Sequence, residues 1–587
     1  MRPAAILAFG AVSASGTGLH ATGARGLGAR ASTRVREDAA LAEAGVRRPA
    51  CARVSDGVAP VASDRRADAV LTLALDACVA ALDERAPGWR SLTIGLALGT
   101  SSGAMQGASR AYGAISAGRA PDRQDAEDLA YAAPFLRARA RLGVPLARSV
   151  SVLGACASST LAIGLGALWL DAGECDVVLA GGYDVVTPFV AAGFASLGAV
   201  TRSAPGPFRQ GRDGLALGEG AAILALVRDR ADALAFVTGF GAASDAGHLT
   251  APDRDGRGLV RACRAALSAA ALEPADVGLV SAHGTATVFN DAAEARAIQS
   301  ILGEASPLAH ALKGELGHTL GAAGALETLA AAASLARGVA QPSAGQGPVD
   351  PDAALRVLDV GESCDAAHAL KTSVAFGGLN AALTVSRLPR EGASEVRRVA
   401  QVALASVSLA EAVAPPGVPP ERAARWDDLT RLVVAAASRL ASSAGLSRGD
   451  DVAVIVGHVA ATVTTNTEVA RRAAEGRPEP RRFPFTSPNA CAGEASSVLG
   501  LVGAAFAVGG APGLGGQAEE TARDLVAHGL ARAALAIEVD DESPTTSALL
   551  AAHGAPMRSA SARGVLLVAD QGQDLLHGAR DGLVSER

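Results

Sequence analysis

Residues 151–170 read SVLGACASSTLAIGLGALWL and contain the pattern that decides the fold. A short β-rich run at 148–153 leads through small residues to Cys156 and then into an Ala- and Gly-rich stretch of helical length. Three more β-rich runs, each bounded by Gly, Ser or charged residues, lie at 91–99, 175–181 and 277–282. Because Ala-rich stretches follow these runs, the sequence predicts an α/β protein with buried sheets.

The remaining elements can be placed around these strands. The sequence predicts helices at 68–84, 158–172, 256–271, 292–302 and 322–336. The polar stretch 387–398 is typical of a linker, and the polar tail after about residue 570 is typical of a loose terminus. The segment AAILAFGAVSASG after Arg2 fits either a signal peptide or a first β-strand, and its alternation into Gly and Ser favours the strand.

Composition excludes several classes of protein. The 587 residues are 49% hydrophobic and 19% charged, with a formal net charge of −6. This apolar fraction argues against a disordered chain, and the lack of a basic block argues against nucleic acid as a partner. No uninterrupted apolar run reaches about 18 residues, so no membrane span is expected. Seven scattered cysteines without a CxxC pair predict neither a disulfide framework nor a metal site, and we expect a cytoplasmic protein.

The basic residues are unevenly divided. Of 53 basic residues, only Lys313 and Lys371 are lysine, and the rest are arginine. Such a ratio suggests a coding background in which arginine replaces lysine wherever chemistry permits. The two lysines therefore mark positions where arginine is not equivalent to lysine.

An internal repeat links the two ends of the chain. The strand ending at Gly99 is matched by one ending at Gly457, and Leu142-Gly143 is matched by Leu499-Gly500. Two further matches, Leu71-Thr72 with Leu429-Thr430 and Gly173 with Gly529, occur in the same order at nearly the same offset. The last part of the chain is therefore interpreted as a degenerate second copy of the first part.

Four motifs carry candidate chemistry. Cys156 lies where a strand passes into a helix, and the helix dipole there favours a thiolate. His283 follows a strand in AHGTAT, with Asp291 and Glu294 in the helix behind it. Lys313 precedes His318 in KGELGHTLGAAG, and a Gly-Gly turn lies in AFGGLNAAL at 375–383. Taken singly, each motif also fits an ordinary structural role, such as a buried cysteine among alanines.

Taken together, these motifs resemble the β-ketoacyl-[acyl-carrier-protein] synthases, the condensing enzymes of the thiolase superfamily. The resemblance rests on GACASS around Cys156, PFRQGRDGLALGEGAA at 207–222, AHGTAT, KGELGHTLGAAG and AFGGLNAAL, and it runs to about residue 388. It implies a thiolase-like layered α/β/α/β/α fold built of two similar halves, 1–250 and 251–390. An additional half-thiolase-like α/β domain would occupy 399–570, followed by a tail at 571–587.

The resemblance also implies roles for individual residues. Cys156 would accept an acyl chain from a carrier-protein thioester, and His283 and His318 would bind the malonyl thioester and assist decarboxylation. The backbone N–H groups of Cys156 and Phe376 would form the oxyanion hole, with Gly377 and Gly378 in the supporting turn. Lys313 would pair with Glu294, and with Asp291 as a second partner. Thr285, Thr287 and Thr250 would bind the phosphopantetheine arm.

The same resemblance implies the partners. No cofactor would be bound permanently, because the phosphopantetheine arrives on the acyl carrier protein together with the acyl or malonyl thioester. The protein would form a homodimer in which strand 148–153 pairs across a twofold axis, or it would join a partner synthase subunit. The motif SVAFGG departs from the common SFGFGG, so the family's acyl-chain selectivity does not carry over to this chain. The loop VFND departs from the common Pro-containing version, which favours a specialised pathway over housekeeping fatty-acid synthesis.

Two alternatives remain beside the condensing enzyme. A non-catalytic subunit like a chain-length factor would usually lose the cysteine that this chain keeps. A coenzyme-A-dependent thiolase would use a second cysteine in place of the two histidines. The sequence suggests no role for Lys371.

The C-terminal repeat is predicted to be non-catalytic. Projecting Cys156 by the repeat offset reaches Pro512, Gly513 and Leu514, none of which is a nucleophile. Cys491, in SPNACAG, mimics the active-site motif but matches a position near residue 134, so it is interpreted as a decoy. The solitary His458 and His528 are interpreted as structural or exposed residues. We expect this repeat to pack against the synthase as a scaffold that helps to shape the acyl pocket.

Overall fold

The first predicted half, residues 1–250, forms one five-stranded sheet. Its strands lie in the order β1 (Ala4–Ser13), β9 (Gly220–Val227), β7 (Val177–Asp184), β5 (Ile94–Gly99) and β6 (Arg148–Leu153). The last three strands are parallel, and their nearly complete burial explains their apolar and small residues. The computed structural model describes residues 1–59, 65–228, 230–303, 307–353, 355–390, 392, 396–509, 516–553 and 560–569. The predicted tail and part of the predicted linker lie outside these residues.

The second half repeats the same strand order. Its strands are β10 (Phe236–Ser244), β17 (Leu379–Ser386), β16 (His368–Ala375), β11 (Val277–Ser281) and β12 (Leu308–His310). Ala4 of β1 pairs with Val237 of β10, where the two halves meet. The prediction of two similar halves is confirmed by this equivalence of order and direction.

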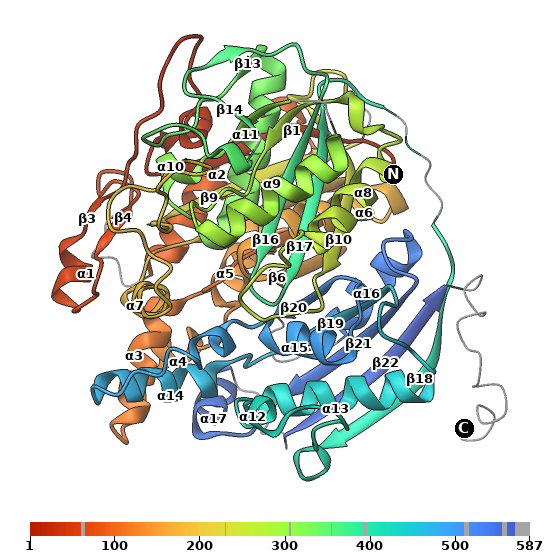
Figure 1. Cartoon of the computed structure of the whole chain (residues 1–587). Coiled ribbons are helices and arrows are strands. Elements are labelled where there is room, and N and C mark those ends of the chain that lie inside the picture. The colour runs from red at the N-terminus through yellow and green to blue at the C-terminus, as the bar shows by residue number, and fades with distance from the viewer. Residues whose placement is uncertain are drawn as a thin grey trace.

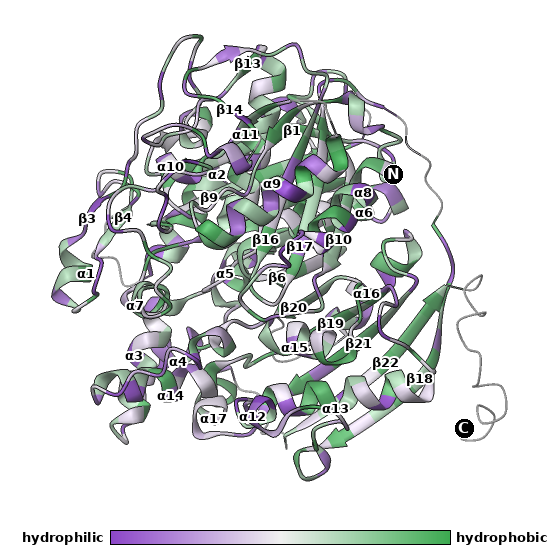
Figure 2. Cartoon of the chain, viewed as in Figure 1, coloured by the Kyte–Doolittle hydropathy of each residue, from purple (hydrophilic) through white to green (hydrophobic). Residues whose placement is uncertain are grey.

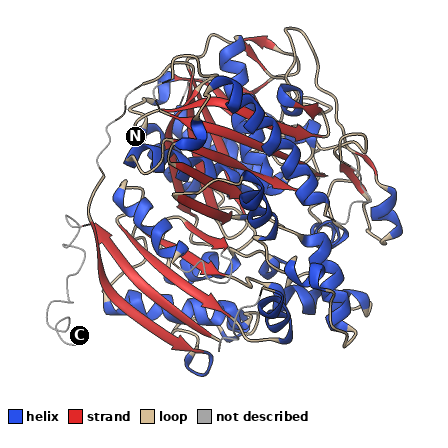
Figure 3. Ribbon diagram, turned by 180° about the vertical axis from the view of Figure 1, so that it is seen from behind, coloured by secondary structure: helices blue, strands red, loops and turns tan. Residues whose placement is uncertain are grey.

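Helices separate and cover the two sheets. Helices α6 (Ser158–Ala172) and α11 (Ala323–Arg337) lie between them, while α2 (Arg66–Arg85) covers β1 and β9 and α8 (Arg257–Ala269) covers β10 and β17. Helix α9 (Val288–Leu302) packs beside α8. The layers therefore follow the predicted α/β/α/β/α order, and Figures 1 and 3 show the helices against the strands.

Helix α6 is apolar on every side because it has no solvent face. Together with the turn before it, Ala155–Ala172 is long and apolar enough to cross a membrane, but 94% of the segment is buried inside the protein. A helix that is apolar all round is typical of a protein core. Figure 2 shows the apolar colouring of the strands and helices in the same region.

The C-terminal repeat builds a third sheet with the order of the first. Its strands are β18 (Val399–Ser408), β22 (Ser561–Ala569), β21 (Ala533–Asp540), β19 (Val452–His458) and β20 (Ala505–Gly509). Its helices are α12 (Pro420–Ala423), α13 (Asp428–Ser443), α14 (Val463–Ala474), α15 (Ala490–Leu499), α16 (Gln517–Ala527) and α17 (Pro544–Ala552). The order matches β1-β9-β7-β5-β6 strand for strand, which confirms the predicted repeat.

Strand β6 pairs within the chain, which corrects the predicted pairing between two copies. Its partner is β20, with Leu153 opposite Ala507 and Val152 opposite Val508 in an antiparallel ladder. These are equivalent strands of the two copies, so the C-terminal repeat lies where the sequence analysis placed a second chain. In Figure 1 the blue and cyan part meets the rest of the molecule at β6 and β20.

Charged and aromatic side chains extend this interface. Asp524 of α16 accepts hydrogen bonds from Trp169 Nε1 at 2.9 Å and from Arg148 Nη2 at 2.8 Å. The Arg148 guanidinium also lies over the Trp169 ring, with its Cζ 4.9 Å from the ring centroid. The repeat is therefore fixed to the synthase by paired backbone and by buried polar contacts.

Candidate active site

Cys156 lies at the sharp turn between β6 and α6. It belongs to the short 3₁₀ segment Ala155–Ala157, and Ala155 adopts a left-handed φ of 48°, which costs energy in a residue other than glycine. The side chain is 7% exposed. Burial raises the pKa of the Cys156 thiol to about 12, against the opposing effect of the Lys313 ammonium. Burial therefore favours the neutral thiol at Cys156, although the helix dipole acts in the opposite direction.

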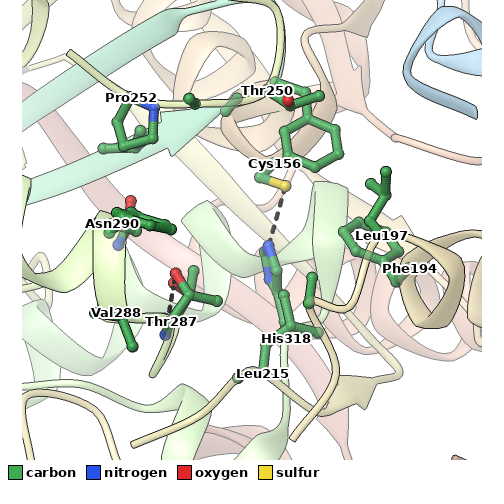
Figure 4. Close-up of a pocket in the computed structure, with 18 of the residues that line it drawn as sticks. Cys156, Phe194, Leu197, Leu215, Thr250, Pro252, Thr287, Val288, Asn290 and His318 are labelled. Carbon is green, nitrogen blue, oxygen red and sulfur yellow. Dashed lines mark hydrogen bonds between the residues drawn. The ribbon is translucent and has the colours of Figure 1, made fainter. Parts of the chain in front are cut away.

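His318 lies directly against this thiol. Its Nε2 is 3.0 Å from Cys156 Sγ (Figure 4). Its Nδ1 accepts a hydrogen bond from the backbone N–H of Leu320 at 3.3 Å. An imidazole that accepts at Nδ1 carries its proton on Nε2 when neutral. Burial, assisted by the Lys313 ammonium, holds the pKa of His318 well below its ordinary value. His318 therefore offers a neutral N–H donor beside the sulfur.

His283 follows β11 and meets His318 edge to face. The ring centroids are 5.4 Å apart, with an interplanar angle of 85°. Lys313 Nζ lies 3.1 Å from His283 Nδ1 and donates to the backbone oxygen of His283. Burial and then the Lys313 ammonium hold the pKa of His283 well below its ordinary value. An ammonium donating to Nδ1 leaves the proton on Nε2, so both histidines are in the same tautomer.

Lys313 pairs with Glu327, which corrects the predicted pairing with Glu294 or Asp291. Lys313 Nζ donates to Glu327 Oε1, and both side chains are 2% exposed. The sequence analysis missed Glu327, although it is the single charged residue between 323 and 336, in an otherwise apolar helix. A lone carboxylate in such a segment indicates a buried cationic partner.

Glu294 and Asp291 instead hold backbone. Glu294 accepts hydrogen bonds from the N–H groups of His283 at 2.7 Å and Gly284 at 2.8 Å, and from Thr372 Oγ1 at 2.6 Å. Asp291 accepts from the N–H of Phe208 at 2.8 Å, and burial raises its pKa to about 7. Glu294 thus fixes the His283 loop, and Asp291 fixes the backbone at Phe208.

Asp184, the last residue of β7, is a buried carboxylate that holds the loop after His318. The sequence analysis did not single it out. Its side chain accepts hydrogen bonds from the N–H of Gly321 at 2.6 Å and of Ser101 at 2.7 Å. Its position after a strand resembles many structural aspartates, so the sequence carried little signal for it. Asp184 therefore connects the histidine loop to the loop after β5.

One cavity of about 500 Å³ joins these groups. It is lined at its inner end by Cys156, His283, His318 and Phe376, and farther out by Thr285, Thr287 and Thr250. The hydroxyls of Thr285 and Thr287 lie 2.9 Å apart. The mouth carries two exposed apolar side chains, Val288 at 51% and Phe289 at 80% exposure. The cavity therefore connects the buried thiol with the protein surface, and Figure 4 shows its lining.

Phe376 is held partly by the C-terminal repeat. Its ring stacks on Phe194 with centroids 5.7 Å apart, and Phe194 in turn contacts the edge of Phe483 at 5.7 Å. The side chain of Asn489 donates from Nδ2 to the Phe376 carbonyl at 2.7 Å. A Cβ on Gly377, whose φ is +87°, would come within 2.6 Å of Asn489 Nδ2, so the turn requires glycine. Gly378, at φ +72°, completes the turn.

The other singled-out residues of the repeat lie away from this cavity. Cys491 is buried in α15, and its Sγ donates to the carbonyl of Pro488 at 3.5 Å. His458 Nε2 is 3.4 Å from the same carbonyl, and His528 Nδ1 is 2.8 Å from the carbonyl of Asp524. Pro512, Gly513 and Leu514 lie outside the described residues. Within the described ranges, no group of three His, Cys, Asp or Glu side chains could hold a metal ion.

The layered fold, with one cysteine and two histidines at the edge of its central helices, defines a protein of the thiolase-like class. The chain belongs to the β-ketoacyl synthase family. The family's N-terminal domain matches residues 59–232 and again 387–565, and its C-terminal domain matches residues 234–346. The double match of the N-terminal domain agrees with the repeat seen in the sheets.

Individual relatives support the same placement. The chain is 34% identical over 248 residues to 3-oxoacyl-[acyl-carrier-protein] synthase 2 of Staphylococcus aureus (strain COL), which is 40% of this chain and 60% of that protein. The chain thus spans about 60% of the length of the curated relatives it matches. The structure of the ishigamide ketosynthase/chain length factor is 30% identical, with a TM-score of 0.59 over 66% of this chain and 99% of that one. The PfaC keto synthase–chain length factor shares the fold alone, at 16% identity and a TM-score of 0.77 over 97% of this chain and 79% of that one.

Proposed function

We propose that this chain is a 3-oxoacyl-[acyl-carrier-protein] synthase, an acyltransferase that catalyses decarboxylative Claisen condensation in a specialised fatty-acid or polyketide pathway. The proposal is carried by the 3.0 Å approach of His318 Nε2 to Cys156 Sγ in a cavity that also holds His283. A chain-length-factor-like subunit without activity fits less well, because the nucleophile, both histidines and Lys313 come together here.

The first half-reaction loads the enzyme. Cys156 Sγ attacks the carbonyl of an acyl thioester, the bond to the carrier's phosphopantetheine sulfur breaks, and the thiol proton ends on that sulfur. His318 Nε2–H stabilises the sulfur as negative charge develops on it. The backbone N–H groups of Cys156 and Phe376 hold the oxyanion, and Thr285, Thr287 and Thr250 bind the pantetheine arm along the cavity.

The second half-reaction forms the new carbon–carbon bond. The malonyl carboxylate leaves as carbon dioxide, and its electron pair becomes an enolate held by the Nε2–H groups of His283 and His318. The enolate carbon attacks the acyl carbonyl on Cys156. The bond to Sγ breaks, Cys156 takes up a proton, and the β-ketoacyl chain leaves on the carrier protein.

The C-terminal repeat, residues 399–570, serves in this proposal as a built-in partner subunit for the synthase halves 1–250 and 251–390. Two observations support it, the β6–β20 ladder and the contacts of Phe483 and Asn489 with the cavity wall. The partners are an acyl carrier protein and its acyl and malonyl thioesters. We place the protein in the cytoplasm, consistent with seven unpaired cysteines.

Incubation with acyl- and malonyl-carrier proteins, followed by mass spectrometry of enzyme and products, tests the activity. We expect an acyl adduct on Cys156, release of carbon dioxide and a β-ketoacyl product. Cys156→Ala should give no adduct, whereas Cys491→Ala, a buried cysteine away from the cavity, should load normally. An adduct on the Cys156→Ala protein would show that the nucleophile is assigned wrongly.

A further inference from the structure

Lys371 is a fully buried lysine with no place in the chemistry above. It lies in β16, and its Nζ donates to Thr160 Oγ1 at 3.1 Å, to the Thr372 carbonyl at 2.8 Å and to Ser373 Oγ. Thr160 belongs to α6, the helix that begins after Cys156, and β16 leads to the Phe376 turn. The ammonium therefore connects the nucleophile's helix with the strand that precedes the oxyanion turn.

The same ammonium contacts the partner of Lys313. Glu327 Oε2 lies 3.1 Å from Lys371 Nζ, while Glu327 Oε1 accepts from Lys313 Nζ. The two lysines of the whole chain thus meet one carboxylate. The compact ammonium of lysine fits this site with its three N–H donors, whereas a planar guanidinium would need more room. This difference explains why position 371 keeps lysine in a chain that otherwise uses arginine.

Lys313, Lys371 and the carboxylates near them form one cluster of buried charges. Lys371 is influenced by Glu327, Lys313 and Glu294, and it acts in turn on Cys263, His283 and His318. With the histidines and the thiol neutral, the ammonium groups of Lys313 and Lys371 face the carboxylates of Glu327 and Glu294. Without Lys371, two buried carboxylates would face one ammonium, close to where the enolate charge develops.

We propose that Lys371 is a positioning residue of the condensation step: it shares Glu327 with Lys313 and supplies a second positive charge that adds to the effects of burial and of Lys313 in disfavouring protonation of His283 and His318. This inference rests on the condensing activity proposed above. Lys371 touches neither substrate nor reacting atoms, and it acts through Glu327 and through its field. Its loss should therefore weaken enolate formation more than acyl loading.

Lys371→Met tests the inference, because methionine has a similar unbranched length and removes the charge. We expect acyl loading of Cys156 to change by less than about twofold and kcat for malonyl decarboxylation to fall about tenfold, with KM nearly unchanged. The acid limb of the rate–pH profile should move to higher pH, because removing a nearby cation raises the pKa of both histidines. Ser373→Ala, which keeps the charge and removes one neutral acceptor, should keep the limb in place.

Two further variants separate a charge effect from a folding defect. Lys371→Gln should behave like Lys371→Met, and Lys371→Arg, if it folds, should keep the position of the acid limb. Wild-type rates and pH profiles in both neutral variants would overturn the proposal and leave the proposed condensing activity intact. Failure of all three Lys371 variants to fold would also overturn it, because Lys371 would then have a structural role. A wild-type protein that neither loads nor decarboxylates would instead refute the proposed function.

Discussion

Asn489 of the C-terminal repeat donates a hydrogen bond to the backbone carbonyl of Phe376 in the catalytic cavity, at 2.7 Å. Asn489 occupies the residue before α15 and makes no capping side-chain hydrogen bond there, and Ser487 Oγ donates to its side-chain oxygen at 2.6 Å. The side chain is therefore fixed at both ends. A residue more than a hundred positions along the chain thus holds the turn that carries an oxyanion donor in the proposed mechanism.

Replacing Asn489 with alanine should loosen this turn. We expect a loss of about 1 kcal/mol of stability for the broken hydrogen bond and a several-fold lower condensation rate. Asn466→Ala is a matched control, since Asn466 donates to Tyr112 and Tyr131 within the same interface and makes no contact with Phe376. Equal condensation rates in the two variants at equal stability would contradict a specific role of Asn489. Steady-state kinetics and thermal unfolding measure both quantities.

Removing residues 399–587 should expose the edge of β6. An uncovered edge strand pairs with other chains, so we expect the truncated protein to self-associate or precipitate, while the full chain stays monomeric. Size-exclusion chromatography with light scattering measures both states, and product analysis reports acyl-chain length. A soluble truncated monomer with unchanged products would show that the repeat is dispensable.

Exchanging Lys313 for arginine should damage decarboxylation more than loading. The larger planar group cannot donate to His283 Nδ1 and Glu327 in the same geometry, so we expect about a hundredfold slower condensation. Acyl-adduct formation on Cys156, followed by mass spectrometry, should continue at a rate close to that of the wild type. An equal loss of both steps would indicate a folding defect in place of a catalytic one.

Acid should destabilise the protein through its buried neutral histidines. Burial lowers the pKa of His310 and of His458 to about 4. Their contribution to stability is complete above the ordinary histidine pKa of about 6.5 and is lost as pH falls towards 4, because the unfolded chain takes up protons that the folded chain excludes. Each of these two histidines can lower the free energy of unfolding by up to about 3 kcal/mol over that pH range.

His458→Gln should flatten this dependence. Denaturant unfolding at several pH values between about 7 and 5 measures how the free energy of unfolding changes with pH. The variant should lose less stability on acidification than the wild type. His20→Gln, at an exposed histidine, provides the control and should keep the wild-type slope. An unchanged slope in the His458 variant would contradict a neutral, buried imidazole.

The sequence predicted the local elements well because each carries its own signal. The strand 148–153 and the helix 158–172 have the same bounds in the structure, and α9 begins earlier than predicted, at Val288, because Thr287 precedes it in extended backbone. The repeat could be found because equivalent turns keep equivalent residues, such as Gly143 and Gly500, both in left-handed backbone.

Pairings between distant residues could not be predicted in the same way. Spacing alone cannot decide which of several carboxylates reaches Lys313, and the one in the buried helix, Glu327, is the partner. The partner of β6 could not be chosen either, because an edge strand fits a second copy or an internal repeat equally well. The raised pKa of Cys156 follows from its burial, which a sequence motif does not reveal.

The fusion of the two copies removes a constraint that symmetry imposes. In a homodimer every interface substitution occurs twice, once in each subunit. Here the equivalent helix-capping positions differ, since α5 (Ala133–Leu142) follows Ala132 and α15 follows Asn489. The second copy has thus been free to specialise a residue that the first does not need. Because the two copies lie in one chain, they are also synthesised in equal amounts.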